Sequence, residues 1–540
     1  MKTILTSLLF AVSLFAGAAT QTDVTYPAPA QFELQSGGVK LSTHASLAEA
    51  IAAATAKGAG TYSVVQPTAT IVVTVTADPT PPAPEPTPPP VTTGPTYYLA
   101  VNGSDTAAGT AAAPWKTFAK AWTVLKAGDT LVVGDGTYTG TVQPPAGKSG
   151  AAGAEIVVRA ANPGAAKLPP MLFKGNAYIT VQGFRVLGTS SAIGIASNGK
   201  GLQSHHLTFR EIGFDCTPGT LNDGACFGLG DGTHHVLLED SWGWGGGRYT
   251  ILCYGGPGGN PPNLGCDDNT FRRVVIRMGP AKSSSGNPQA ALGLYYASRN
   301  LVENFVALDG VPASNSSNAA IYITGHAPPP NADGNRFFGV VAVNHKGAGL
   351  YVDCPGAVCN GTEVRDSVFW ATQGGVSLGG GTGAGDSCKS VVVDHVTVGR
   401  SSLAGYDAYA CTAALTNSAL YANQFGAYQA NAGTTTAHHV GYFGNVQGAR
   451  NNIAAGAGDL ASDPGFVSAL RIEAGSPYKG AGSSGDIGAN VVNRYVDGVL
   501  TATALFPWPN EARIKAEMCA SVTTGFCASI SLSAYLASFK

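Results

Sequence analysis

Charged residues are scarce in this sequence. Lys, Arg, Asp and Glu make up 12% of its 540 residues, about half of the usual share. This composition excludes a coiled coil and a highly charged disordered chain. The formal net charge is only -2, and no block of Lys or Arg could neutralise a run of phosphates, so we expect no nucleic-acid partner.

Long hydrophobic runs are also lacking. The apolar run Ile4–Phe15 is too short to span a bilayer. Lys2 precedes it and the small residues 16–18 follow it, a pattern typical of a secretory signal peptide over residues 1–18. We therefore expect a secreted protein, extracellular or periplasmic, with no membrane span.

Cysteine is absent from the N-terminal third of the chain, and ten cysteines follow it. They lie in neighbouring pairs: Cys216 and Cys226, Cys253 and Cys266, Cys354 and Cys359, Cys388 and Cys411, Cys519 and Cys527. An even count in an exported chain favours disulfides. The alternative, a zinc site, lacks the ligand spacing that zinc requires. Pairing between neighbours is our expectation, although spacing alone does not fix the connectivity.

Glycine and proline, by contrast, are abundant, with 72 and 33 residues. Proline concentrates in residues 78–95 and predicts a stiff, extended linker. Before it, an Ala-rich pattern over Ser46–Lys57 predicts a helix and Tyr62–Val75 predicts strands, so residues 19–77 should form a small α+β module. After it we place a main domain, residues 96–500, and a C-terminal cap, residues 501–540.

A seven-residue pattern of apolar and polar positions recurs through the main domain. Its copies start at Val181, Phe209, Leu238, Phe271, Val302, Phe337, Val364, Val392 and Leu415. A second short strand lies between copies, as in FGLG from Phe227 and IYIT from Ile321. Repeated short strands with variable loops predict an all-β parallel β-helix, whose coils bury their inward residues by stacking. A sandwich of antiparallel hairpins is the alternative, but it does not explain equivalent segments recurring in register.

The two ends of such a solenoid need protection, because a terminal coil leaves a strand edge open. A helix predicted over Trp115–Leu125 would cover the first coil. A short helix predicted after Pro509 would close the opposite end, with help from Cys519 and Cys527.

Four segments carry a family resemblance: YYLAVNGSD, APWKTFAKA and AGDTLVVGDGTY near the start of the main domain, and GDIGAN near its end. Over Thr96–Asn493 the chain resembles the right-handed parallel β-helix proteins of the pectate-lyase-like superfamily. This resemblance implies the fold and points to carbohydrates, because members of known activity mostly act on acidic or plant, algal and bacterial polysaccharides. It does not imply one reaction, since the fold hosts lyases, hydrolases, epimerases and adhesins.

One position of the aligned repeats reads Arg210, Glu239, Arg272 and Glu303. Stacked coils would bring these side chains together as an alternating charge ladder. We interpret the ladder as solvent-exposed and stabilising, not as catalytic.

The second strand of each coil points one central residue outward: Gly228, Gly293, Tyr322, Tyr351 and Ser377. Glycines would keep the floor of a groove open. Tyr322 and Tyr351 would bind substrate by presenting their aromatic faces to sugar rings. An aromatic stack that only stabilises neighbouring coils is the alternative.

Four candidate catalytic residues flank these outward positions. Arg248 and Lys346 precede their strands, whereas His326 and Asp353 follow theirs or end them. Eliminative cleavage of a uronate polymer needs a base beside the uronate carboxylate and a cation or metal that neutralises this carboxylate. The resemblance implies Lys346 or Arg248 as that base. A solvated surface lysine is the alternative for Lys346.

We expect no metal and no other cofactor. Calcium is the alternative, but Asp231 and Asp353 would lie four coils apart, too far to share one ion. Histidines occur in adjacent pairs: His205 with His206, His234 with His235, and His438 with His439. Neighbouring strand residues point to opposite faces, so we interpret these pairs as structural.

The function expected from the sequence is that of a secreted polysaccharide lyase that cleaves a uronate-containing polymer by β-elimination. One alternative is a glycan-binding protein or cell-surface adhesin without turnover. Another is a glycoside hydrolase on the same fold, although no pair of carboxylates on neighbouring coils stands out as that reaction requires.

Overall fold

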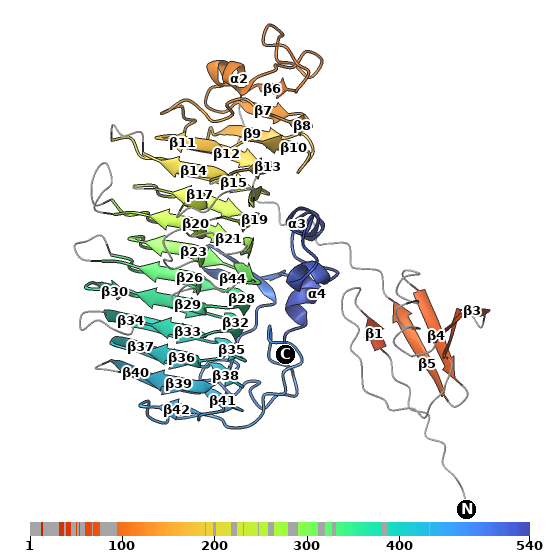
Figure 1. Cartoon of the computed structure of the whole chain (residues 1–540), viewed down its shortest axis with the longest axis vertical. Coiled ribbons are helices and arrows are strands. Elements are labelled where there is room, and N and C mark those ends of the chain that lie inside the picture. The colour runs from red at the N-terminus through yellow and green to blue at the C-terminus, as the bar shows by residue number, and fades with distance from the viewer. Residues whose placement is uncertain are drawn as a thin grey trace, which may run out of the picture. The chain divides into compact units, whose positions relative to one another are not determined.

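Short parallel strands repeat along most of the chain and form three long β-sheets, drawn in Figure 1 for this computed structural model. The structure describes residues 12–14, 32–36, 39–44, 50, 53, 60–66, 69–75 and 94–540, except 190, 198–200, 218–223, 231, 247, 257–263, 279–289, 311–318, 327–330, 380–386 and 431–432. Two units result, residues 88–528 with 539–540, and residues 1–87 with 529–538.

In the described part of the larger unit the three sheets contain 12, 11 and 14 strands, and we call them sheets I, II and III. Sheet I contains β8 (Gly136–Thr137), β10 (Ala166–Leu168), β13 (Arg185–Leu187), β16 (Gly213–Cys216), β19 (Trp242–Gly245), β22 (Val275–Arg277), β25 (Val306–Leu308), β28 (Val341–His345), β32 (Val368–Thr372), β35 (Thr397–Gly399), β38 (Ala419–Tyr421) and β41 (Gly441–Phe443). Sheet II contains β11 (Met171–Lys174), β14 (Ile193–Ala196), β17 (Ala225–Leu229), β20 (Tyr249–Tyr254), β23 (Ala290–Tyr295), β26 (Ala319–Thr324), β29 (Ala348–Asp353), β33 (Val376–Leu378), β36 (Ala404–Ala408), β39 (Phe425–Gln429) and β42 (Arg450–Asn451). Sheet III contains β6 (Thr96–Leu99), β7 (Thr130–Val133), β9 (Ile156–Ala160), β12 (Ala177–Gln182), β15 (His205–Arg210), β18 (Leu237–Glu239), β21 (Thr270–Arg272), β24 (Leu301–Glu303), β27 (Arg336–Phe338), β30 (Val358–Asn360), β31 (Glu363–Arg365), β34 (Ser387–Asp394), β37 (Cys411–Thr416) and β40 (Thr434–His438).

Neighbouring strands in these sheets pair in parallel, and the coils follow one another from β12 through β13 and β14 to β15. The predicted right-handed parallel β-helix is therefore confirmed, and the antiparallel sandwich is excluded. The aligned repeats also pair as expected, for example Val181 with Phe209 and Phe209 with Leu238. The repeat predicted at Val392 is wrong by one residue, because Val393 pairs with Val364.

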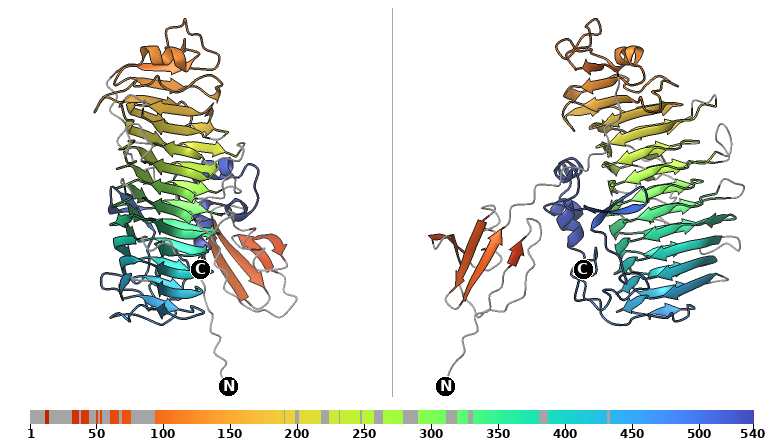
Figure 2. Two further views of the ribbon diagram at one scale, coloured as in Figure 1. Left: turned by 60° about the vertical axis from the view of Figure 1, so that its left-hand side comes forward. Right: turned by 180° about the vertical axis from the view of Figure 1, so that it is seen from behind.

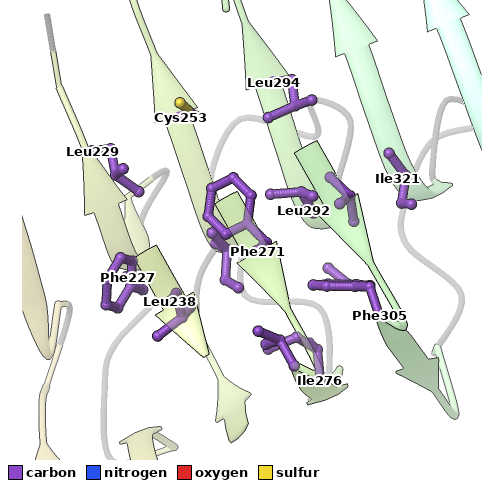
Figure 3. Close-up of a cluster of buried hydrophobic side chains, with 14 of the residues drawn as sticks. Phe227, Leu229, Leu238, Cys253, Phe271, Ile276, Leu292, Leu294, Phe305 and Ile321 are labelled. Carbon is purple, nitrogen blue, oxygen red and sulfur yellow. The ribbon is translucent and has the colours of Figure 1, made fainter. Parts of the chain in front are cut away.

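The interior of the solenoid is a continuous column of buried apolar side chains (Figure 3). On sheet II, Phe227, Ile251 and Leu292 stack from coil to coil. Phe271 of sheet III and Ile276 of sheet I meet them from the other walls. Each coil therefore leaves its outward side chains free to differ, because the inward ones hold the stack.

The first end is capped as predicted. Helix α2 (Phe118–Val124) begins after Thr117, whose side chain accepts a hydrogen bond from the Lys120 backbone N–H. The helix buries Phe118 and Trp122 in the same core as the first coils. A helix covers an open strand edge that would otherwise pair with another chain.

The C-terminal segment does not cap the other end. Helix α3 (Glu511–Met518) forms where a helix was expected, but it contacts β19 in the middle of sheet I (Figures 1 and 2). The Trp242 Nε1 donates to Glu517 at 3.0 Å, and the Arg513 guanidinium lies 4.6 Å from the Trp242 ring centre. The expected end cap is wrong because this pairing anchors the helix to the side of the solenoid. The short 3₁₀ helix η1 (Gly525–Ala528) follows.

The arginine–glutamate ladder, Arg210, Glu239, Arg272 and Glu303, forms across β15, β18, β21 and β24 as predicted. Arg210 lies 2.9 Å from Glu239, and Arg272 lies 3.2 Å from Glu239 and 2.7 Å from Glu303. Its expected solvent exposure is wrong. The side chains of Arg272, Glu239 and Glu303 are at most 6% exposed, because the antiparallel hairpin β43 (Asn493–Val496) and β44 (Val499–Ala504) lies over them. The hairpin's Gly498 N–H donates to Glu303.

All five cysteine pairs form the disulfides predicted from their spacing. Three of them, Cys216–Cys226, Cys253–Cys266 and Cys354–Cys359, begin within one residue of the end of β16, β20 and β29 and close the loops that follow these strands. Such short bridges hold loops next to the strands that they leave.

The smaller unit holds an antiparallel sheet in the order β5 (Ala69–Val75), β4 (Gly60–Gln66), β2 (Phe32–Ser36) and β3 (Val39–His44), with β1 (Val12–Leu14) parallel to β5. The strands expected over Tyr62–Val75 are confirmed as the β4–β5 hairpin. The unit also includes α4 (Leu532–Ala537). The predicted helix at Ser46–Lys57, the linker at 78–95 and the signal peptide lie mostly outside the described residues. No described helix is long and apolar enough to cross a membrane.

Candidate functional site

The outer face of sheet II carries the outward residues predicted from the sequence. Gly228, Gly293, Tyr322, Tyr351 and Ser377 lie on one line across the strands, in register with one another. The line also includes Leu172, Gly194, Leu252, Asp407, Tyr428 and Asn451. The side chains on either side of it point into the core, so this line is the floor of the exposed face.

Seven rings gather in the middle of this face, and we call them the aromatic cluster: Tyr249, Tyr254, Tyr295, Tyr296, Tyr322, His326 and Tyr351. Ring centres of Tyr254 and Tyr295 lie 5.8 Å apart, those of Tyr295 and Tyr322 6.0 Å, and those of Tyr322 and Tyr351 5.6 Å. Tyr322 is only 2% exposed and supports its neighbours, whereas Tyr254 is 40% exposed. The cluster thus offers solvent-facing rings on a rigid base.

A shallow hollow adjoins the aromatic cluster on the preceding coils. It is lined by Leu172, Gly194, Gly228, Gly230 and Leu252, among others. The missing side chains of the glycines leave the backbone of sheet II accessible there. The hollow and the aromatic cluster lie next to each other along the line of outward residues.

Arg248 lies against the aromatic cluster. Its guanidinium is 4.9 Å from the ring centre of Tyr249 and 5.8 Å from that of Tyr295. Cation–π contact and the planar shape of the guanidinium favour this stacking. The residue immediately precedes β20, so the positive charge reaches over the strands from the edge where sheet II begins.

A hydrogen bond links the cluster to a carboxylate. The Tyr322 hydroxyl donates to Asp353 Oδ2 at 2.9 Å across neighbouring coils. Burial, and then the negative charge of Asp353, raise the pKa of Tyr322 well above its usual range. Tyr322 therefore stays protonated and holds Asp353 in place.

His326 lies at the opposite edge of the same cluster, two residues after β26. Its ring stacks on Tyr295 with centres 5.9 Å apart and planes 21° apart, and it also contacts Tyr296. Nε2 of His326 is 3.5 Å from Thr324 Oγ1. The imidazole is half-buried, so solvent or a ligand can reach it.

Five of the six predicted site residues thus meet in one connected group. Arg248 and His326 both contact Tyr295, and Tyr295 contacts Tyr322, which reaches Tyr351 and Asp353.

The sixth residue, Lys346, lies elsewhere. It is exposed in the turn before β29, and its side chain makes no hydrogen bond or ion pair with the residues that the structure describes. Asp353 ends β29, so the length of the strand separates the two residues by roughly 16 Å.

Sequence reasoning missed Tyr295 and Asp407. Tyr295 ends the predicted strand LGLY, two residues beyond the central outward residue Gly293. Asp407 follows the same apolar–outward–apolar pattern on β36, and Ser377 Oγ donates to its Oδ2 at 2.6 Å. Burial raises the pKa of Asp407 to about 6, against a partial opposing effect of that hydrogen bond. Continuing the strand alignment by one coil would have found it.

Comparisons with known proteins match the chain only distantly. The model of a family described as "Protein of unknown function (DUF1565)" matches residues 101–143, around α2. The search of curated proteins gives no match.

Solved structures with a similar chain path include pectate lyase Pel9A, at 17% identity and a TM-score of 0.41, covering 74% of this chain and 96% of that one. The A-module of the Azotobacter vinelandii mannuronan C-5 epimerase AlgE6 has 12% identity and a TM-score of 0.39, with 62% and 91% covered. The catalytic domain of a GH87 α-1,3-glucanase has 12% identity and a TM-score of 0.37, with 80% and 87% covered. Values this low do not distinguish between reactions.

Proposed function

We propose that the outer face of sheet II binds a polysaccharide and that the protein is a polysaccharide lyase, which cleaves a uronate-containing polymer by β-elimination. The observation that carries this proposal is the position of Arg248, a permanent cation held among the rings of the aromatic cluster, with His326 in the same group. Neutral sugars would need the rings alone, whereas a uronate also needs the cation.

Binding would use the solvent-facing rings and the guanidinium together. The apolar faces of sugar rings stack on Tyr254, Tyr295 and Tyr351. Arg248 has five donors in a fixed plane and forms paired hydrogen bonds with a carboxylate. Arginine does not lose its proton in proteins, which makes Arg248 a carboxylate-neutralising group and not the base.

The elimination needs a base for the proton next to the uronate carboxylate. The imidazole of His326 takes this proton, and the electron pair left on the carbon forms the new double bond. The bond to the glycosidic oxygen at the adjacent carbon breaks, and a proton from solvent completes the leaving hydroxyl. Arg248 stabilises the charge that builds up on the carboxylate meanwhile. Lys346 is the rival base, at the other edge of the sheet.

The test is turnover of a panel of uronate and neutral polysaccharides, followed by the ultraviolet absorbance of the unsaturated product. His326→Gln and Arg248→Gln should each lower kcat/KM by about 100-fold or more. Lys346→Ala should leave turnover unchanged. Loss of turnover in Lys346→Ala but not in His326→Gln would give the base role to Lys346. Glycan binding without any product would establish the adhesin alternative.

A glycoside hydrolase is the second candidate, and the raised pKa of Asp407 favours it. A carboxyl group that is still protonated near neutral pH can donate a proton to a leaving sugar oxygen. Asp353 would be the second carboxylate, two coils away across sheet II and two residues further along the strand, about 12 Å at these spacings. New reducing ends without unsaturated product, lost in Asp407→Asn, would identify this reaction.

A further inference from the structure

Four histidines on two neighbouring coils form a group that the proposed function does not use. We call it the histidine cluster: His205 and His206 at the start of β15, and His234 and His235 just before β18. The Nδ1 atoms of His205 and His206 lie 2.8 Å apart, and those of His234 and His235 also lie 2.8 Å apart. Between coils, His205 stacks on His234 and His206 on His235, with ring centres 5.0 and 4.8 Å apart.

The backbone explains why adjacent histidines turn toward each other. His206 and His235 have φ angles of 50° and 54°, in the left-handed region, so the chain does not continue as a flat strand there. The expectation that each pair would point to opposite faces is therefore wrong. Stacking of the coils then aligns the two pairs, since His205 pairs with His234 across the coils.

We propose that the histidine cluster binds one divalent late transition metal ion, of the class of Zn²⁺, Ni²⁺ or Cu²⁺, and so links two coils of the solenoid. Ligand atoms of His206, His234 and His235 all lie within 4.8 Å of one another. Metal–nitrogen bonds of 2.0–2.1 Å put two ligands at a right angle about 2.9 Å apart, close to the spacing within each histidine pair. Binding of one ion then requires the stacked rings of the two coils, whose centres lie 5.0 and 4.8 Å apart, to turn toward each other.

The chemistry of the donors selects the class of metal. Imidazole nitrogen suits Zn²⁺, Ni²⁺ and Cu²⁺, whereas calcium and magnesium require oxygen. The carboxylates on the next coil, Asp267 and Asp268, are engaged by Arg299 at 3.2 and 2.8 Å.

The third histidine pair provides a matched control. His438 and His439 have Nδ1 atoms 3.1 Å apart, and His439 has a φ angle of 53°, but the preceding coil has Thr416 in register with His438. A single pair supplies two ligands, which is too few for a closed site.

The experiment is calorimetric titration of the full chain, without a histidine tag and after chelator treatment, with Zn²⁺, Ni²⁺ or Cu²⁺ alone. One ion should bind per chain. His206→Asn with His235→Asn should weaken binding at least about tenfold. Asparagine tolerates the left-handed backbone, so this variant should keep its fold. His438→Asn with His439→Asn should leave the affinity unchanged.

A second measurement does not depend on any variant. The electron paramagnetic resonance spectrum of the Cu²⁺-loaded chain should show splitting from several nitrogen ligands. Absence of stoichiometric binding, equal loss in the two double variants, or a spectrum without nitrogen splitting would each overturn the proposal. None of these results bears on turnover of polysaccharides, so the two proposals fail separately.

Discussion

Burial of the arginine–glutamate ladder makes a quantitative prediction, because the chain contains an exposed counterpart. Arg272 contacts Glu303 and Glu239 on the coils on either side of it, and its side chain is 6% exposed. Arg299 similarly contacts the carboxylates of Asp267 and Asp268, but it is 57% exposed. Replacing each arginine by glutamine removes the same charge from two different environments.

The two substitutions should lower the free energy of unfolding by amounts that differ severalfold. Arg272→Gln leaves Glu303, which is 0% exposed, without its charged partner, and the Gly498 N–H alone cannot offset the cost of a buried carboxylate. Removing one member of a buried ion pair costs about 3–5 kcal/mol of the free energy of unfolding. Arg299→Gln should cost about 1 kcal/mol or less, because water solvates the freed carboxylates.

The assay is denaturant unfolding of both variants, followed by circular dichroism, with hydrogen exchange of the backbone amides of β21 and β24 as a local readout. Coils of a solenoid can open separately, so the local readout guards against an unfolding curve with several steps. Equal destabilisation by the two substitutions, or faster exchange around Arg299 than around Arg272, would refute the reasoning.

Two further predictions concern the outer face of sheet II. The pKa of Asp407 is about 6 in the folded protein, against an ordinary value of 3.8 that applies to the unfolded chain. Ionisation of Asp407 therefore destabilises the fold as the pH rises from about 4 to above 6. Asp407→Asn should thus stabilise the protein by up to about 3 kcal/mol at pH 8 and not below about pH 4, and an equal change at both pH values would exclude this origin. A Cβ at Gly293 would lie 2.8 Å from the Tyr249 ring, whereas one at Gly228 would meet nothing closer than 3.8 Å. Gly293→Ala should therefore weaken glycan binding in calorimetry while Gly228→Ala should not, and equal affinities would contradict a role for the Tyr249 position.

The parallel β-helix could be predicted because each coil repeats the same local pattern. Residues such as Phe227 and Leu229 flank an outward glycine, and the same alternation recurs on strand after strand. The pattern also predicted that Tyr322 and Tyr351 would be neighbours, since register follows directly from the alignment of coils. The disulfides could be predicted for a similar reason, because the two cysteines of each one lie close together in the chain.

Contacts between distant segments could not be predicted in this way. The hydrogen bond between Trp242 and Glu517 joins residues 275 positions apart, and no repeat relates them. The Gly498 N–H that reaches Glu303 comes from 195 positions further along the chain. These contacts decide that the ladder is buried and that α3 lies on sheet I, so both expectations failed for one reason.

The direction of side chains at the turns was the second feature that the sequence could not predict. It changes which residues lie together in a site, but it leaves the fold unchanged. Alternation between inward and outward residues holds only while the backbone stays extended, and it ends where φ becomes positive. His206 and His235 lie at such positions. Each therefore has a ring nitrogen next to that of the preceding histidine, which was expected on the opposite face of the strand. In a solenoid the turn recurs on every coil, which means that one misjudged turn position misplaces a whole stack of side chains. A sequence search for ligands in this fold should therefore align the turn residues of successive coils as carefully as the strands.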